Sequence, residues 1–142
     1  MIVRYQPFAG QLSGMIVPAG DHCVIGVNSL EAPVRQRFTI AHELGHFHLH
    51  PAREFVDRSF ATRFRNELAR AGVDSDEIEA NRFAAELLMP VEFVHKDLAD
   101  VEIDVADADE LIERLAKRYQ VSKQAMTIRL TTLGLGSALG IE

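Results

Sequence analysis

Two histidines and a glutamate within the run HELGH, residues 42–46, have the types and spacing needed to bind and use a zinc ion. Residues i and i+4 of a helix share one face, so His42 and His46 can direct two imidazoles at one metal ion. Glu43 lies about 100° further round the helix, where its carboxylate can reach water at the metal without being a ligand. This is the general-base position of a zinc metalloprotease.

The helix that carries HELGH is predicted to run from about Val34 to His50 and to be ended by Pro51. Apolar residues flank the two histidines, and Gly45 permits the close approach of another backbone. The helix is therefore predicted to be buried, and buried imidazoles and carboxylates need polar partners. A metal ion would supply them, whereas a chance helix with two surface histidines is the alternative.

A catalytic zinc site needs a third protein ligand and one open position. His50 is not expected to bind the same ion, because it lies about 12 Å from His42 along the helix axis. Glu77 on a later predicted helix is the favoured third ligand, with Glu79 as the alternative. Asn81 shares a face with Glu77 and can hydrogen-bond the second ring nitrogen of a ligand histidine. Alternatively, Glu77 has no role in metal binding and only caps the start of its own helix.

Composition indicates an ordinary soluble globular chain. It has 142 residues, of which 47% are hydrophobic and 25% charged, enough for one domain with its own core. The net charge of −6 argues against a broad nucleic-acid surface, so no direct nucleic-acid binding is expected. No apolar run is long enough to span a membrane, and the N-terminus lacks the pattern of a signal peptide. Because Cys23 is the one cysteine, no internal disulfide can form, and a cytoplasmic location is expected.

The predicted elements give an α+β fold, with a small antiparallel β-sheet packed on a zincin-like active-site helix. Residues 12–28 are predicted to form a hairpin around a four-residue turn, Pro-Ala-Gly-Asp. After the HELGH helix, an edge strand is possible at 54–60 and a short helix at 62–71, closed by Gly72.

Further helices are expected toward the C-terminus. One is predicted at about 75–89, opened by a capping box of Asp74 and Glu77. Short helical structure is expected at 91–98, followed by helices at about 108–119 and from about 122 to Leu133. Residues 1–142 are predicted to form a single domain, with the C-terminal helical pair at about 108–135 packed on it.

Two longer runs carry a family resemblance. RQRFTIAHELGHFHLH (35–50) and EIEANRFAAELLMP (77–90) together resemble the ImmA/IrrE family of zinc metallo-endopeptidases. VNS (27–29) and LAKRYQVSKQAMTIRLTTLGL (115–135) fit the same family, so the resemblance covers about residues 24–135. It implies Zn²⁺ ligands at His42, His46 and Glu77, with Glu43 as catalytic base. It also implies a protein partner and substrate, a helix-turn-helix repressor of the Xre type, whose cleavage relieves transcriptional repression.

The expected reaction is hydrolysis of a peptide bond in a specific protein substrate, which would lie extended on an edge strand. The oxyanion also needs a donor, and residue type alone offers several candidates, namely Tyr5, Tyr119, His48, His50, His95 and Arg82. One rival interpretation is a non-catalytic zinc-binding partner that sequesters a repressor. Another is a DNA-binding module in the helix-turn-helix-like segment 115–133, with Lys123, Gln124 and Arg129 on its second helix. The acidic net charge favours two amphipathic packing helices over that module.

Overall fold

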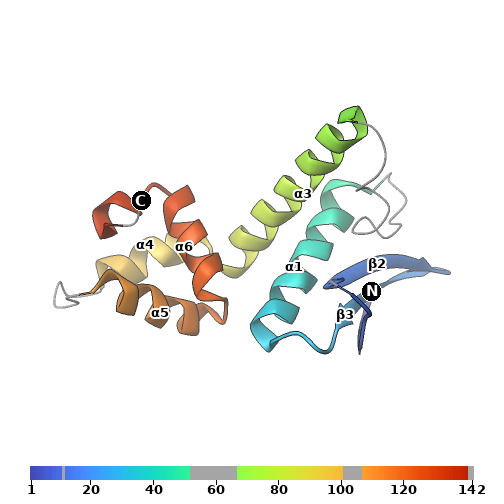
Figure 1. Cartoon of the computed structure of the whole chain (residues 1–142), viewed down its shortest axis with the longest axis horizontal. Helices are drawn as coiled ribbons and strands as arrows, with labels where there is room; N and C mark the ends of the chain where they lie inside the picture. The colour runs from blue at the N-terminus through green and yellow to red at the C-terminus, as the bar shows by residue number, and fades with distance from the viewer. Residues whose placement is uncertain (11, 52–66, 101–106, 141–142) are drawn as a thin grey trace. The chain divides into compact units, whose positions relative to one another are not determined.

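A computed structural model describes residues 1–10, 12–51, 67–100 and 107–140 (Figure 1). The chain forms two compact units, Met1–Ala84 and Ala85–Glu142, and each is described by itself. The expected packing of the C-terminal helical pair on the rest of a single domain therefore stays a prediction. The possible edge strand at 54–60 lies outside the described residues.

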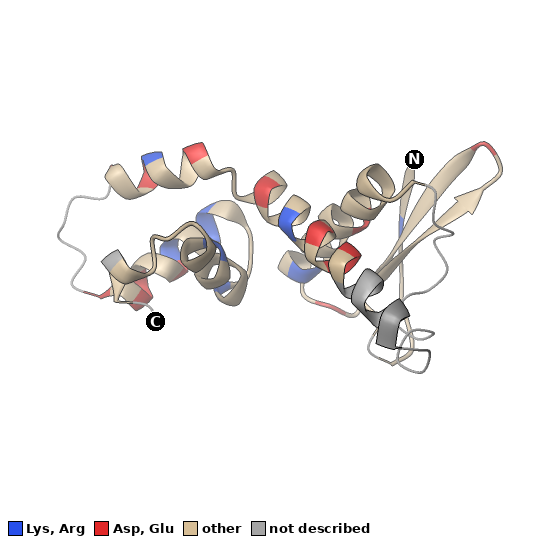
Figure 2. Ribbon diagram, turned by 90° about the horizontal axis from the view of Figure 1, so that it is seen from above, with Lys and Arg blue, Asp and Glu red and all other residues tan. Residues whose placement is uncertain are grey.

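Charged residues of both signs are interspersed along the helices of the structure (Figure 2). Within one helix, for example, Lys117 Nζ lies 2.8 Å from a carboxylate oxygen of Glu113. Such alternation is typical of solvated helix faces. In the part of the chain that the structure describes, no helix has the length and apolar character needed to cross a bilayer.

The predicted hairpin is present as strands β2 (Gly14–Ala19) and β3 (His22–Asn28), which pair antiparallel. Its loop is tighter than the predicted four residues, because Ala19 already pairs with His22. In the type II′ turn, one of the two favoured two-residue hairpin loops, the first loop residue has a positive φ. Gly20 adopts a φ of 67° there, at no steric cost.

The α+β class is confirmed, but the sheet is mixed rather than purely antiparallel. An additional strand, β1 (Ile2–Gln6), pairs parallel with β3, which gives the order β1-β3-β2. All five residues of β1 are exposed. The strand therefore lacks the alternation of buried apolar and exposed polar residues from which a strand is predicted.

Helix α1 (Pro33–Leu49) packs against the sheet within the first unit. Ile16, Ile25 and Val27 form the buried cluster of the sheet. The helix contributes apolar side chains at i, i+4 and i+7, which are Ile40, Leu44 and Phe47. Cys23 packs at the edge of the same cluster, as expected of a small core residue. The predicted packing of a zincin-like helix on a small sheet is confirmed.

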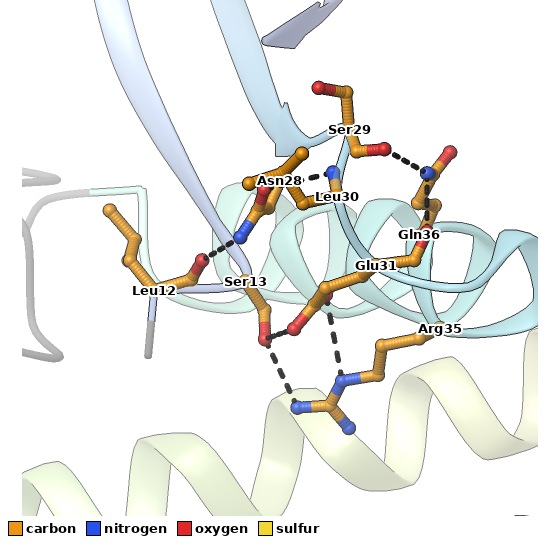
Figure 3. Close-up of polar contacts among 8 residues, drawn as sticks. All are labelled: Leu12, Ser13, Asn28, Ser29, Leu30, Glu31, Arg35 and Gln36. Carbon is orange, nitrogen blue, oxygen red and sulfur yellow. Dashed lines mark hydrogen bonds and ion pairs between the residues drawn. The ribbon is translucent and has the colours of Figure 1, made fainter. Parts of the chain in front are cut away.

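A buried asparagine fixes the approach of the chain to α1 (Figure 3). Asn28 Nδ2 donates to the carbonyl of Leu12 at 3.0 Å, and its Oδ1 accepts from the amides of Leu30 (3.1 Å) and Phe8 (3.3 Å). Gln36 continues the network by donating to the carbonyls of Ser29 and Glu31. One side chain thus ties the segments before β2, after β1 and before α1 together.

Helix α3 (Glu67–Leu88) begins earlier than the predicted start at residue 75. Asp74 lies inside the helix, so the predicted capping box is wrong, and Gly72 does not close a separate helix. Glycine in a helix interior costs about 1 kcal/mol relative to alanine, which tertiary packing of a long helix can offset.

The second unit contains α4 (Val91–Ala99), α5 (Ala108–Tyr119), α6 (Lys123–Thr132) and a short 3₁₀ turn at Ser137–Leu139. These helices agree with the predicted ones to within one or two residues. The Ser122 hydroxyl caps α6 by accepting from the amide of Ala125 at 3.1 Å. The unit has its own fully buried side chains, including Met89, Val94, Met126 and Leu130.

Arg129 is buried in this unit, which differs from its predicted place on a recognition helix. It is 7% exposed, donates from Nε to the carbonyl of Met89 at 3.0 Å and pairs with the Glu86 carboxylate. Lys123, the other basic residue of that prediction, pairs with Asp109. These contacts of Arg129 and Lys123 favour the interpretation of segment 115–133 as packing helices over the alternative of a DNA-binding module.

Candidate metal centre

The two histidines of HELGH lie on one face of α1 and converge. Their Nε2 atoms are 3.0 Å apart, and their rings meet edge to face with centroids separated by 4.6 Å. His46 is buried and His42 is partly buried. The i, i+4 spacing thus directs both imidazoles at one point, as predicted from helix geometry.

Glu77 on α3 completes a group of three donors. Its Oε2 lies 3.1 Å from His42 Nε2, and its Oε1 lies 3.1 Å from His46 Nε2. The three ligand atoms fall within 4.8 Å of one another. Ligands about 2.1 Å from a tetrahedral zinc ion are about 3.4 Å apart, so only a small expansion of this triangle would admit the ion. Two imidazoles and one carboxylate are also a donor set that zinc accepts in catalytic sites.

Asn81 orients one of these imidazoles. Its Oδ1 lies 3.0 Å from His42 Nδ1, so that nitrogen is the donor, and Nε2 is left as the atom that could bind a metal ion in place of its proton. Asn81 is one turn beyond Glu77 on α3, so a single helix face supplies both the carboxylate and the orienting amide. The geometry matches the predicted pairing of Asn81 with a ligand histidine.

The cluster is electrostatically coupled in the absence of a metal ion. Burial raises the pKa of Glu77, but hydrogen bonds from His42 and His46 outweigh it and hold that pKa well below its usual range. Burial lowers the pKa of His42, but the Glu77 hydrogen bond and the charges of Glu43 and Glu77 raise it above 6.5 overall. Both pKa shifts arise because the contacts between the imidazoles and the Glu77 carboxylate outweigh the opposing effect of burial.

Glu43 is buried beside the start of β2. The residue is 9% exposed, and a Cβ atom placed on Gly14 would lie 3.7 Å from its Oε1 and would overlap the side chain of Thr39. The absence of a side chain at Gly14 therefore lets the sheet approach α1 at this carboxylate. Neither Gly14 nor Thr39 was predicted to matter here, because the sequence shows no signal for a contact between β2 and α1.

Close approach of α1 and α3 brings the three candidate metal-binding residues together. A Cβ atom on Gly45 would lie 3.0 Å from Ala80 Cα and 3.1 Å from the Ala80 carbonyl oxygen. Gly45 was predicted to permit the close approach of another backbone. That backbone is the one at Ala80, a fully buried residue that lies between Glu77 and Asn81 in the sequence.

His50 and the remaining donor candidates lie elsewhere. The His50 ring faces Asp76 and Glu79 rather than the three-donor group, and Glu79 is 51% exposed. Residues predicted as oxyanion donors are spread over both units: Tyr5 on exposed strand β1, His48 beside the ring of Phe83, Arg82 exposed on α3, His95 exposed on α4 and Tyr119 donating to Asp97. The structure selects none of these as the donor.

A comparison with protein families places this arrangement in context. Residues 3–131 match the peptidase family described as the IrrE N-terminal-like domain. The chain belongs to this family. Its IrrE-like domain therefore covers nearly the whole chain, including the three strands, the histidine helix and the helices of the second unit. The resemblance stated from the sequence is confirmed, and the family assignment supports a metallopeptidase-like role.

One curated protein is similar over part of this IrrE-like domain. The "Uncharacterized immunity region protein 2" of Bacillus phage phi105 is 41% identical over 66 residues, which are 46% of this chain. The match covers 37% of the phage protein, so the chain spans well under half of that relative's length.

Proposed function

We propose that this IrrE-like domain is a zinc-dependent endopeptidase that hydrolyses one peptide bond in a specific protein substrate. The observation that carries the proposal is the convergence of His42, His46 and Glu77, each within about 3 Å of the next, on one point at the surface between α1 and α3. His42 and His46 would hold the ion together with Glu77, and Asn81 would keep His42 in the ligating tautomer. A zinc ion bound there supplies Lewis-acid polarisation of the scissile carbonyl and makes nearby water more acidic.

Glu43 is the proposed general base. It neighbours His42 in the chain, and its charge is close enough to raise the pKa of that histidine. It would accept the proton of the attacking water and pass it to the departing amine, the two transfers that peptide hydrolysis requires. Its burial against Gly14 restricts the carboxylate to this position, which favours one defined geometry for the transfer.

The substrate would bind as an extended strand along β2. This strand is an outer one in the order β1-β3-β2, and its first residue, Gly14, lies beside Glu43. An added strand could use backbone groups of β2 that no described strand pairs with, while its scissile bond reaches the general base. Hydrogen exchange of the β2 amides should slow when substrate binds the inactive Glu43→Gln variant.

The proposed substrate is a helix-turn-helix repressor of the Xre type, and its cleavage would relieve repression in the cytoplasm. The support is the family assignment together with the phage protein, whose name refers to an immunity region. The alternative is a zinc-binding partner that sequesters the repressor without cutting it.

A cleavage assay distinguishes the two. The zinc-loaded protein would be incubated with an Xre-type repressor encoded at the same locus, and the products would be identified by mass spectrometry. Glu43→Gln should slow cleavage at least about 10²-fold, whereas Glu110→Gln, which removes an exposed carboxylate of α5, should not. Stable binding of the repressor without any product would favour sequestration, and absence of zinc binding would refute both alternatives.

A further inference from the structure

A second cluster of metal-binding side chains lies at the C-terminal end of α1. His50, the residue that ends this helix, is 8% exposed in its side chain and lies between two carboxylates of α3. Its Nδ1 is 3.6 Å from Asp76 Oδ1, and its Nε2 is 3.7 Å from Glu79 Oε2. Asp76 is buried, whereas Glu79 is half exposed, so the cluster opens to solvent on the Glu79 side.

The Nε2 atom of His50 is unusual because it is buried and has no hydrogen-bond partner among the described residues. Buried polar nitrogens are nearly always paired, so one without a partner among the described residues calls for an explanation, of which a bound ion is one. The Glu79 carboxylate faces this nitrogen, but 3.7 Å is too long for a hydrogen bond. A separation near the 3.4 Å edge of a tetrahedral zinc site instead leaves room for an ion between the two atoms.

This cluster is separate from the first group of donors. The first group uses His42, His46 and Glu77, whereas the nearest rings of the two groups, those of His46 and His50, have centroids 5.6 Å apart. His50 lies two helical turns beyond His42, about 12 Å along the axis, which places its ring too far along α1 to share an ion with His42.

We propose that His50 Nε2 and Glu79 bind a second divalent transition-metal ion, with water completing its coordination. The negative charge of Asp76, 3.6 Å from Nδ1, would favour the proton on that nitrogen and so leave the Nε2 lone pair for the metal, the tautomer that carboxylates favour behind many metal-binding histidines. An imidazole with carboxylates suits Zn²⁺, Co²⁺ or Ni²⁺ rather than Ca²⁺.

The local charge also favours a cation. Two carboxylates face one imidazole here, and the C-terminal end of a helix carries partial negative charge from its unpaired carbonyls. With two protein ligands instead of three, this site should bind zinc at least tenfold more weakly than the first group. The bound ion would link the end of α1 to α3 and so add to the stability of the first unit.

Calorimetric titration of the metal-free full chain with Zn²⁺ tests the proposal without depending on peptidase activity. The unmodified protein should show two events, one tight and one weaker. Glu79→Gln should weaken the second event at least tenfold and His50→Gln should abolish it, while both keep the tight event. Because Glu79 is half exposed, its substitution leaves the fold intact even if His50→Gln does not. Glu110→Gln is the matched control and should leave both events unchanged.

Several outcomes would overturn the proposal. One is a single binding event in the unmodified protein, and another is a weaker event that survives unchanged in Glu79→Gln. A third is a second event of equal strength with Ca²⁺, which would show that the His50 cluster is a general acidic site. A result in which His42→Gln removes the tight event but keeps the weak one would support two independent sites.

Discussion

Replacing Gly45 by alanine tests whether close approach of α1 and α3 holds the metal ligands together. The new methyl group would lie 3.0 Å from Ala80 Cα, 3.1 Å from its carbonyl oxygen and 3.2 Å from Phe83 Cβ. Two of these three atoms belong to the backbone, so no side-chain rotation can relieve the contact. The helices must instead separate by a few tenths of an ångström.

Two opposing terms set the expected change in stability. Overpacking of a well-packed interface costs about 1–3 kcal/mol, whereas alanine in place of glycine within a helix contributes about 1 kcal/mol. The metal-free protein should therefore lose about 0–2 kcal/mol of its free energy of unfolding.

Zinc affinity should fall more than stability does. Ala80 lies between Glu77 and Asn81, so a shift of its backbone moves both the carboxylate that spans the two imidazoles and the amide that orients His42. Displacing such orienting groups typically costs 10–100-fold in metal affinity. We expect a loss in that range for Gly45→Ala.

Competition with a chelator of known affinity would measure zinc binding, and urea denaturation of the metal-free protein would measure stability. His48→Ala is the control, because His48 is an exposed residue of the same helix; its zinc affinity should change by less than about twofold. If Gly45→Ala bound zinc as tightly as the unmodified protein, close helix packing at Gly45 would not be what positions Glu77.

Other predictions concern single side chains. Glu43→Gln should keep zinc affinity within a few-fold while proteolysis falls at least about 10²-fold, as compared by chelator competition and by product formation. Asn81→Ala should weaken zinc binding by about 10–100-fold, and unchanged affinity would contradict its orienting role. Burial, followed by the hydrogen bond to Asp97, raises the pKa of Tyr119 to about 12. Since an unfolded tyrosine titrates near pH 10, this interaction stabilises the fold fully below pH 10 and is lost as the pH rises toward 12. In a Tyr5→Phe background, absorbance at 295 nm should follow Tyr119 alone, and Asp97→Asn should lower its midpoint.

The candidate site could be predicted largely from the sequence because its geometry is local to two helices. The i, i+4 rule brings His42 and His46 together whatever the rest of the fold does, and the same rule places Asn81 beside Glu77. Predicting that the two helices lie close together required one further inference, namely that Gly45 permits the close approach of another backbone.

Features that depend on long-range contacts were harder to predict. Strand β1 has no buried residue, so nothing in its pattern distinguishes it from an exposed tail. The role of Asn28 follows from three backbone groups in separate segments, which no local pattern encodes. Arg129 has the spacing of an exposed recognition residue, but the carbonyl of Met89 and the Glu86 carboxylate satisfy it within the second unit.

The division of the ligands between α1 and α3 has a consequence for how this domain can change over evolutionary time. A metal held by His42, His46 and Glu77 would cross-link α1 to α3 and so close the chain segment that joins the two helices. The entropy of closing a flexible loop grows only with the logarithm of its length, so doubling such a loop costs about 0.6 kcal/mol. Insertions between the two helices would therefore weaken the centre far less than a substitution at Gly45. Residues added between α1 and α3 would leave the spacing of the three donors on each helix unchanged.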